Sequence, residues 1–312
     1  MKVLVTGATG FIGRQVVDRL REAGFDTRIV SRQPEGFAAG SDVVPLPGID
    51  APDEAFLGLM RDVTHVVHCA ALNNDRNACE ADYLAANAKL TGRVAKAAAA
   101  RAGGRFVYLS SIRAVAGPGF SGTVDEATPT DPRCAYGRSK REGEIALLDA
   151  YGSAGRVDAT ALRLSPVYGK GMKGNMAALM RLADTALPLP TGALTGVRSL
   201  LSSEAAAGAV LHLMTRPGPL RPIYLAGNAM PVSMREMITA FRQGFGRSPR
   251  LFPMPPRPLA AAAALLGKGA GWQALTATQI CDPSRLMSEG WKPETDTLGG
   301  LHDLARLAGQ AL

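Results

Sequence analysis

A tyrosine and a lysine stand four positions apart in the segment Tyr136-Gly137-Arg138-Ser139-Lys140. Positions i and i+4 lie on one face of a helix, so the lysine ammonium can lie near the phenol. A nearby cation favours the phenolate and lowers the pKa of the tyrosine toward neutrality. Tyr136 could then donate or accept a proton during a reaction. Because a Tyr–Lys pair at this spacing also arises by chance, its value depends on the other motifs of the chain.

A glycine-rich turn near the N-terminus supplies the second chemical signal. Residues 7–13 read Gly-Ala-Thr-Gly-Phe-Ile-Gly and lie between a β-branched apolar run and an amphipathic segment. In such a unit the glycines permit a tight turn, the approach of the backbone to a pyrophosphate, and close packing of helix and strand. The helix N-terminus favours the phosphate charge. This context predicts a dinucleotide-binding turn whose cofactor contacts are Gly7, Gly10, Phe11, Ile12 and Gly13.

The apolar run 107–109 ends in two hydroxyls, Ser110 and Ser111. Loops at the carboxyl ends of parallel strands form the ligand crevice of such sheets. A serine there can hydrogen-bond a substrate oxygen as charge develops on it. One serine alone is as readily a turn residue, so this signal depends on the first two.

The elements that must position these residues alternate along the chain. Continuous apolar strands separated by helices indicate a parallel sheet covered on both faces. Beyond residue 165 the stretch 166–200 is rich in Gly and Pro, and Ser233 with Glu236 forms a capping box at the start of a further helix. The expected strands are 2–6, 27–30, 43–46, 65–68, 105–109, 160–164 and a returning strand at 223–226, and the main helices are 80–100 and 135–149.

We therefore expect an α/β protein with a Rossmann-type doubly wound parallel sheet and a smaller C-terminal substrate-binding lobe. The expected nucleotide-binding domain comprises residues 1–165, with a returning segment near 196–228. The expected lobe comprises residues 166–195 and 229–312. The length of 312 residues suits one large or two modest domains.

Composition excludes several other classes of protein. The apolar share is 46% and the charged share 20%, which is ordinary globular usage and excludes a disordered or collagen-like chain. The net charge of +8 suits either solubility or an anionic partner. No basic run with interleaved aromatic residues is present, so we do not expect a nucleic-acid partner.

The cysteines, histidines and apolar runs point away from metals and membranes. His65 and His68 are three apart on an expected strand and so point to opposite faces, which favours structural roles. The early break at Gly7 does not suit a signal peptide, and the apolar run 259–266 is too short to span a bilayer. We expect a cytoplasmic protein with no metal site and with reduced thiols, because no C-x-x-C pair occurs among Cys69, Cys79, Cys134 and Cys281.

The segments TGATGFIG, HCAA, YLSS and YGRSK together resemble the extended short-chain dehydrogenase/reductase family of NAD(P)-dependent nucleotide-sugar epimerases, dehydratases and reductases. The resemblance covers nearly the whole chain. It includes Asn87 in a helix, the acidic pair Asp125-Glu126 and, later in the chain, Arg163, Asn175, Arg198 and the run GWKP at 290–293.

This resemblance implies catalytic roles for three residues. Tyr136 would be the acid/base, Lys140 would hold the nicotinamide ribose and tune Tyr136, and Ser111 would orient the reacting oxygen. Ser111 is preferred to Ser110 because it lies 25 residues before Tyr136, a separation familiar in the family. The resemblance also implies cofactor contacts at Ala70, Ala71 and Asn87, and contacts with a nucleotide diphosphate at Asn175 and Arg198. A homodimer through the helices 85–100 and 135–149 is the family expectation.

Departures from the family pattern narrow the reaction and the cofactor. Sugar 4,6-dehydratases carry Asp-Glu after the active-site hydroxyl, whereas Ile112-Arg113 follow Ser111, which disfavours dehydration. The second strand is followed by Arg32 rather than a carboxylate, which slightly favours NADP(H) over NAD. Asp50 is expected to touch the adenine.

A reductase consumes a hydride in every cycle and is well served by NADPH. The sequence thus favours a 4-reductase of a UDP-4-keto-6-deoxy-(N-acetyl)hexosamine. Two alternatives stay open: a UDP-hexose 4-epimerase with tightly bound NAD, and a non-catalytic NADP-binding sensor on the same fold.

Overall fold

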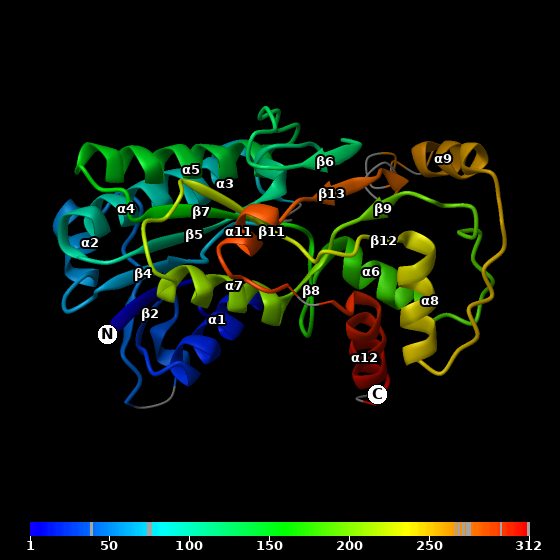
Figure 1. The fold of residues 1–312 in the computed structure, drawn as a ribbon, viewed down its shortest axis with the longest axis horizontal. Helices are drawn as coiled ribbons and strands as arrows, with labels where there is room; N and C mark the ends of the chain where they lie inside the picture. The colour runs from blue at the N-terminus through cyan, green and yellow to red at the C-terminus, as the bar shows by residue number, and fades with distance from the viewer. Residues whose placement is uncertain are drawn as a thin grey trace.

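The computed structural model describes residues 1–37, 40–73, 77–265, 267, 269, 272, 276–293 and 295–310. A central sheet occupies one half of the molecule, and helices and short strands from the C-terminal part of the chain form a lobe in the other half (Figure 1). No helix among these residues is long and apolar enough to cross a membrane.

Seven strands form the central sheet in the order β11-β7-β5-β4-β1-β2-β3, and all neighbouring pairs are parallel. The order reverses between β1 and β4, the position at which open α/β sheets bind ligands. The expected strands are confirmed, with small changes at their ends. They are β1 (Lys2–Thr6), β2 (Asp26–Ser31), β3 (Val43–Pro45), β4 (His65–His68), β5 (Phe106–Ser111), β7 (Ala159–Leu164) and β11 (Ile223–Ala226).

Helices cover both faces of this sheet (Figure 1). Successive side chains of a strand point to opposite faces, so Val3 and Val5 of β1 join the core under α1 and α7, whereas Leu4 joins the core under α2, α4 and α5. These helices are α1 (Phe11–Glu22), α7 (Ser203–Thr215), α2 (Asp53–Leu59), α4 (Leu90–Arg101) and α5 (Ala135–Ser153).

The Ala-rich helix expected over 80–100 contains a π-helical turn. The helix α3 (Glu80–Leu84) leads into the π turn η2 (Ala85–Lys89), which continues into α4. Asn87 lies in this turn with its side chain fully buried. Because π turns are frequent at functional sites, this departure from a regular helix marks Asn87 as a residue of interest.

The C-terminal lobe has its own apolar core, to which Leu179, Ile238 and Leu301 contribute. The predicted capping box is confirmed: Ser233 Oγ accepts a hydrogen bond from Glu236 N at 3.2 Å, and the Glu236 carboxylate accepts one from Ser233 N at 2.7 Å. Apart from the strands of a second sheet, which is described next, the remaining elements are α6 (Gly174–Ala183), α8 (Met234–Gly244), α9 (Pro256–Leu265), α11 (Ser284–Ser288), α12 (Thr297–Gln310), β8 (Val167–Tyr168), β10 (Leu201–Ser202), η1 (Pro34–Gly36) and η3 (Ile112–Ala114).

A second sheet, which the sequence did not predict, joins the lobe to the chain that follows β5. Its order is β12-β9-β13-β6. The strands β6 and β13 are parallel, as are β13 and β9, whereas β9 and β12 are antiparallel. This small sheet therefore holds the chain after Ser111 close to the strand that carries Arg198. Its strands are β6 (Gly122–Val124), β9 (Val197–Arg198), β12 (Val232–Ser233) and β13 (Gln279–Cys281).

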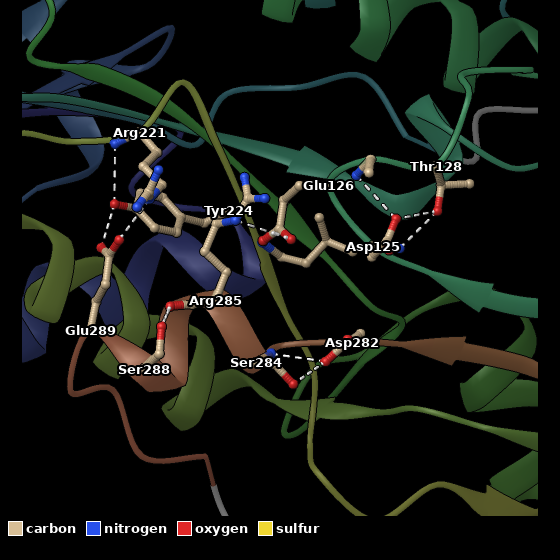
Figure 2. A network of polar contacts seen from close by, with 12 residues as sticks. Asp125, Glu126, Thr128, Arg221, Tyr224, Asp282, Ser284, Arg285, Ser288 and Glu289 are labelled. Carbon is tan, nitrogen blue, oxygen red and sulfur yellow. Dashed lines mark hydrogen bonds and ion pairs between the residues drawn. The ribbon is translucent and has the colours of Figure 1, made fainter.

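A network of polar contacts fastens the segment 282–289 to the central sheet (Figure 2). Tyr224 on β11 donates a hydrogen bond to Glu289 at 2.5 Å, and Arg221 forms an ion pair with the same carboxylate at 3.0 Å. Glu126, which follows β6, accepts a hydrogen bond from the backbone of β11 at 3.3 Å and pairs with Arg285 of α11 at 3.5 Å. The network thereby fixes the β6–β13 pair relative to the central sheet.

Candidate active site

The glycine turn lies at the carboxyl end of β1, beside the end of β4. Gly7 has a φ of 68°, a conformation that favours glycine, and a Cβ there would lie 2.6 Å from Ala70 N. A Cβ at Gly13 would lie 2.1 Å from Gly7 O, so only glycine allows α1 to pack this closely on the turn. Gly10 is the N-cap of α1, and no side chain caps this helix. The N–H groups of its first turn are thus available to an anion.

The other predicted cofactor residues differ in their distance from this turn along the sheet edge, and only Ala70 has a described contact with the end of β1. Ala70 and Ala71 follow β4 after one intervening residue, Cys69, and Ala70 N donates a hydrogen bond to Thr6 Oγ1 at 3.2 Å. Arg32 directly follows β2 and is exposed. Asp50 is also exposed and borders, with Lys89, a hollow along α4 and α5. No described contact joins Asp50 to the glycine turn, and its contact with an adenine stays a prediction.

Phe11 and Ile12 form the first turn of α1 and are half-buried. Phe11 packs against the core of the C-terminal lobe, whereas Ile12 packs against the core of the central sheet. The first turn of α1 therefore lies where the two cores meet. Their contacts with a cofactor stay predictions.

Tyr136 lies in the first turn of α5, next to the chain that follows β5. A Cβ at Gly137 would lie 2.3 Å from the carbonyl oxygen of Arg113, so glycine is what allows α5 to begin against this loop. The close approach brings the phenol of Tyr136 near the side chain of Ser111, which acts on its pKa. The ring also meets Tyr83 of α3 edge-on, with 6.4 Å between the ring centroids.

The protonation of Tyr136 differs from the sequence-based prediction. Burial raises the pKa of Tyr136 to about 12, and the side chain of Ser111 and the charge of Arg113 oppose this rise. The expected lowering by Lys140 is therefore wrong for this structure. The phenol is protonated at neutral pH, which is the form that a proton donor requires.

Lys140 follows one turn later on α5, and its side chain is almost completely buried. Its Nζ donates a hydrogen bond to Leu109 O at 2.6 Å and lies 4.3 Å from the centre of the Tyr108 ring. Burial lowers the pKa of Lys140 to about 7, although Glu144 acts in the opposite direction. The lysine is thus held against β5.

The two serines at the end of β5 differ in burial and in hydrogen-bond partners. Ser110 is buried and donates a hydrogen bond to Glu144 at 2.6 Å, so its hydroxyl is used within the protein interior. Ser111 is half-buried and accepts a hydrogen bond from Arg113 N at 3.2 Å, on the same side as Tyr136. This arrangement supports the preference for Ser111.

Asn87 links three segments around the site. Its amide nitrogen donates to Leu72 O and to Ser139 Oγ, both at 2.9 Å, and its amide oxygen accepts from Leu72 N at 2.7 Å. Both amide hydrogens are therefore used within the protein. Any influence of this side chain on a cofactor passes through the loop after β4 and through α5.

His68 belongs to the same buried network. Its Nδ1 bonds with Thr6 Oγ1 at 2.7 Å and its Nε2 with Thr91 Oγ1 at 3.0 Å, and Thr91 donates onward to Asn87 O at 2.7 Å. Burial lowers the pKa of His68 to about 3, so the ring is neutral. These contacts support the structural role expected for His68. No cluster of three potential metal ligands occurs in the described part of the chain.

The two predicted substrate residues lie in the C-terminal part of the chain. Arg198 is 8% exposed and is located on β9, in the small sheet. Asn175 is exposed near the start of α6. No contact of Asn175 with the other candidate residues is described.

The sequence-based reasoning missed Glu144, which contacts Ser110, Arg141 and Arg163. A signal for it was present, because Tyr136, Lys140 and Glu144 repeat at the i, i+4 spacing of one helix face.

Residues 3–227 match the NAD dependent epimerase/dehydratase family. The chain belongs to this family. The UDP-glucose 4-epimerase of Vibrio cholerae is 29% identical over 323 residues, which cover 99% of this chain and 96% of that protein. The dTDP-4-dehydrorhamnose reductase of Burkholderia thailandensis is 32% identical over 194 residues, which cover 59% of this chain and 56% of that protein.

Solved structures share the fold of this epimerase/dehydratase family member. MoeE5 in complex with UDP-glucuronic acid and NAD matches with a TM-score of 0.77 at 22% identity, over 100% of both chains. The resemblance stated from the sequence motifs is thereby confirmed at the level of the family and of the fold.

Proposed function

We propose that this chain is an NAD(P)-dependent oxidoreductase that acts on C4 of a nucleotide-activated sugar, with Ser111, Tyr136 and Lys140 as its catalytic residues. The observation that carries the proposal is the pairing of Tyr136 with Ser111 at the carboxyl end of β5. The uncapped glycine turn at the end of β1 lies at the same edge of the sheet. A proton donor and a pyrophosphate cradle are the two parts that such a reaction needs.

The residues of the turn fit a dinucleotide. Gly7, Gly10 and Gly13 leave the backbone open where a Cβ would collide with its neighbours, and α1 offers uncapped N–H groups to a pyrophosphate. Ala70 and Ala71 would border the same cofactor. When bound, a nicotinamide dinucleotide supplies or accepts a hydride.

We propose net reduction of a UDP-4-keto-6-deoxy-(N-acetyl)hexosamine as the reaction. The C4 carbon gains a hydride, the C4 oxygen gains the phenolic proton of Tyr136, and Ser111 orients that oxygen. One observation supports reduction: the chain after β2 reads Arg32-Gln33 without a carboxylate that would favour NAD. The similarity to a UDP-glucose 4-epimerase over 99% of the chain favours 4-epimerisation with bound NAD as the second candidate.

A spectrophotometric assay distinguishes these functions. Purified protein is mixed with a UDP-4-keto-6-deoxyhexosamine and either NADPH or NADH, and absorbance of the reduced nicotinamide is followed. We expect stoichiometric loss of absorbance, faster with NADPH. No loss, together with C4 inversion of a UDP-hexose, would instead identify the epimerase. Tight NADP binding without either reaction would identify a sensor.

We also propose a homodimer formed through α4 and α5. A hollow of about 820 Å³ along these helices is bordered by Gly92 and Ala146, and a Cβ at Gly92 would lie 3.3 Å from that of Ala146. Two such helices from each subunit could pack as four helices. Sedimentation equilibrium is expected to give twice the chain mass at micromolar concentration. A mass equal to one chain would contradict the dimer.

We retain as proposals a nucleotide-binding domain of residues 1–165 with the segment 196–228, and a substrate lobe of residues 166–195 and 229–312. The parallel order of the central sheet supports the first unit. The four cysteines are free thiols, which is typical of a cytoplasmic location.

A further inference from the structure

Arg113 occupies a place where a structural role does not account for a guanidinium. It lies in η3, two residues after Ser111, and its side chain is half-buried. Its Nη1 donates a hydrogen bond to Gly117 O at 2.9 Å. Within the described part of the chain, this is the only hydrogen bond of the side chain, and the side chain forms no ion pair.

The segment that binds Arg113 also contacts β13, the strand that pairs with the strand of Arg198. Gly117 O accepts a second hydrogen bond, from Gln279 Nε2 at 3.3 Å. Gln279 lies on β13, directly opposite Arg198 of β9 in the register of the small sheet. Gly117 thereby brings Arg113 to the side of the small sheet on which the predicted diphosphate residue lies.

The charge of Arg113 acts on two neighbours. Burial lowers the pKa of Arg198 to about 10, and the charge of Arg113 contributes to this lowering. The same charge also opposes the rise in the pKa of Tyr136 that burial causes. Arg113 therefore lies within electrostatic reach both of the proposed proton donor and of Arg198.

The guanidinium of Arg113 is half-buried and has no ion pair among the described residues, an arrangement that is unfavourable unless an anion binds it. Burial of an uncompensated charge is costly, and burial lowers the pKa of Arg113 as well. Guanidinium groups bind carboxylates and phosphates through two parallel hydrogen bonds. The guanidinium N–H groups of Arg113 that do not bond with Gly117 O are suited to bind such a group.

We propose that Arg113 is a substrate-binding residue that holds an oxyanion of the substrate beside Tyr136. The proposal rests on the proposed function and deepens it, because it assigns a second cationic contact in addition to the predicted one at Arg198. With the proposed 6-deoxyhexosamine the oxyanion is a phosphate of the nucleoside diphosphate, whereas a carboxylate would require a uronic acid as the sugar. The chemistry of recognition is the same for both, and the experiment separates them.

The test compares ligand binding to the full-length protein and to Arg113→Gln by titration calorimetry. The probes are UDP, UDP-glucose, UDP-glucuronate and inorganic diphosphate. We expect Arg113→Gln to weaken the binding of at least one probe by about 10- to 100-fold, the usual effect of losing a charged hydrogen bond. Equal weakening of all four probes assigns the phosphate, and weakening of UDP-glucuronate alone assigns the carboxylate.

Controls separate binding from folding. Arg101→Gln removes an exposed arginine at the end of α4 and is expected to leave all affinities unchanged. Arg113→Lys keeps the charge and is expected to retain part of the affinity, while the affinity for NADP(H) stays at the wild-type value in both Arg113 variants. If Arg113→Gln does not fold, Arg113→Lys decides, because loss of the planar fork alone should weaken the same probe.

Two outcomes overturn the proposal. The first is wild-type affinity for every probe in a folded Arg113 variant, and the second is a wild-type protein that binds none of the four anions. Failure of the three uridine compounds alone argues against a UDP-sugar substrate, and diphosphate then still decides the role of Arg113.

Discussion

Replacement of Tyr136 by phenylalanine is expected to lower kcat by about 10²- to 10⁴-fold, the range that loss of a general acid produces. The change removes the phenolic oxygen near Ser111, and it keeps the ring that meets Tyr83 edge-on. The fold and the glycine turn should therefore persist. Steady-state kinetics with the 4-keto sugar and NADPH measure the loss, and quenching of protein fluorescence by NADPH measures the cofactor affinity, which is expected to change less than about twofold.

Tyr83→Phe provides the matched control for this substitution. It removes a hydroxyl from the neighbouring buried ring and is expected to keep kcat within a few-fold of the wild type. Activity of Tyr136→Phe within threefold of the wild type would show that another group supplies the proton. Equal losses in both variants would show that packing of the rings, rather than the phenol, controls the rate.

Replacement of Glu144 by alanine is expected to lower the free energy of unfolding by about 3–5 kcal/mol, because one partner of a buried ion pair is left without its counter-charge. Arg163 is 1% exposed and donates to the two Glu144 oxygens at 2.8 and 2.7 Å. Ser110 also donates to this carboxylate, at 2.6 Å. Urea denaturation followed by circular dichroism measures the loss.

Two variants make this stability prediction specific. Glu142→Ala removes an exposed carboxylate from the same helix and is expected to change the unfolding free energy by less than about 0.5 kcal/mol. The double variant Glu144→Leu with Arg163→Met removes both charges and is expected to be more stable than Glu144→Ala. A loss below about 1 kcal/mol for Glu144→Ala would contradict the assigned role of the pair.

The sequence predicted those parts of the fold that local patterns specify. The continuous apolar runs 2–6, 65–68 and 223–226 are strands because each is buried between two layers of helices. The tight turn at residues 7–13 could also be predicted, because glycine stands at the positions where a Cβ would collide with its neighbours. The pairing of the active-site elements then followed from the parallel order of the sheet.

Other features depend on tertiary contacts and carry no local signal. Strands β6 and β13 have three residues each, too few for a periodic pattern, and more than 150 residues separate them in the chain. The run Leu-Ala-Ala-Asn-Ala reads as a regular helix, and its π turn accompanies the bonds of Asn87 to Leu72 and Ser139. The pKa of Tyr136 was mispredicted because helix spacing reveals the nearby lysine but not the burial of the phenol.

We expect Tyr136 to face a nicotinamide whose pyrophosphate lies on the glycine turn. A crystal structure of the protein with NADPH tests it most directly. The pyrophosphate is expected to lie against the N–H groups of the first turn of α1, and the nicotinamide within van der Waals reach of the Tyr136 phenol. A pyrophosphate bound away from Gly10, or a Tyr136 hydroxyl directed away from the nicotinamide, would contradict it.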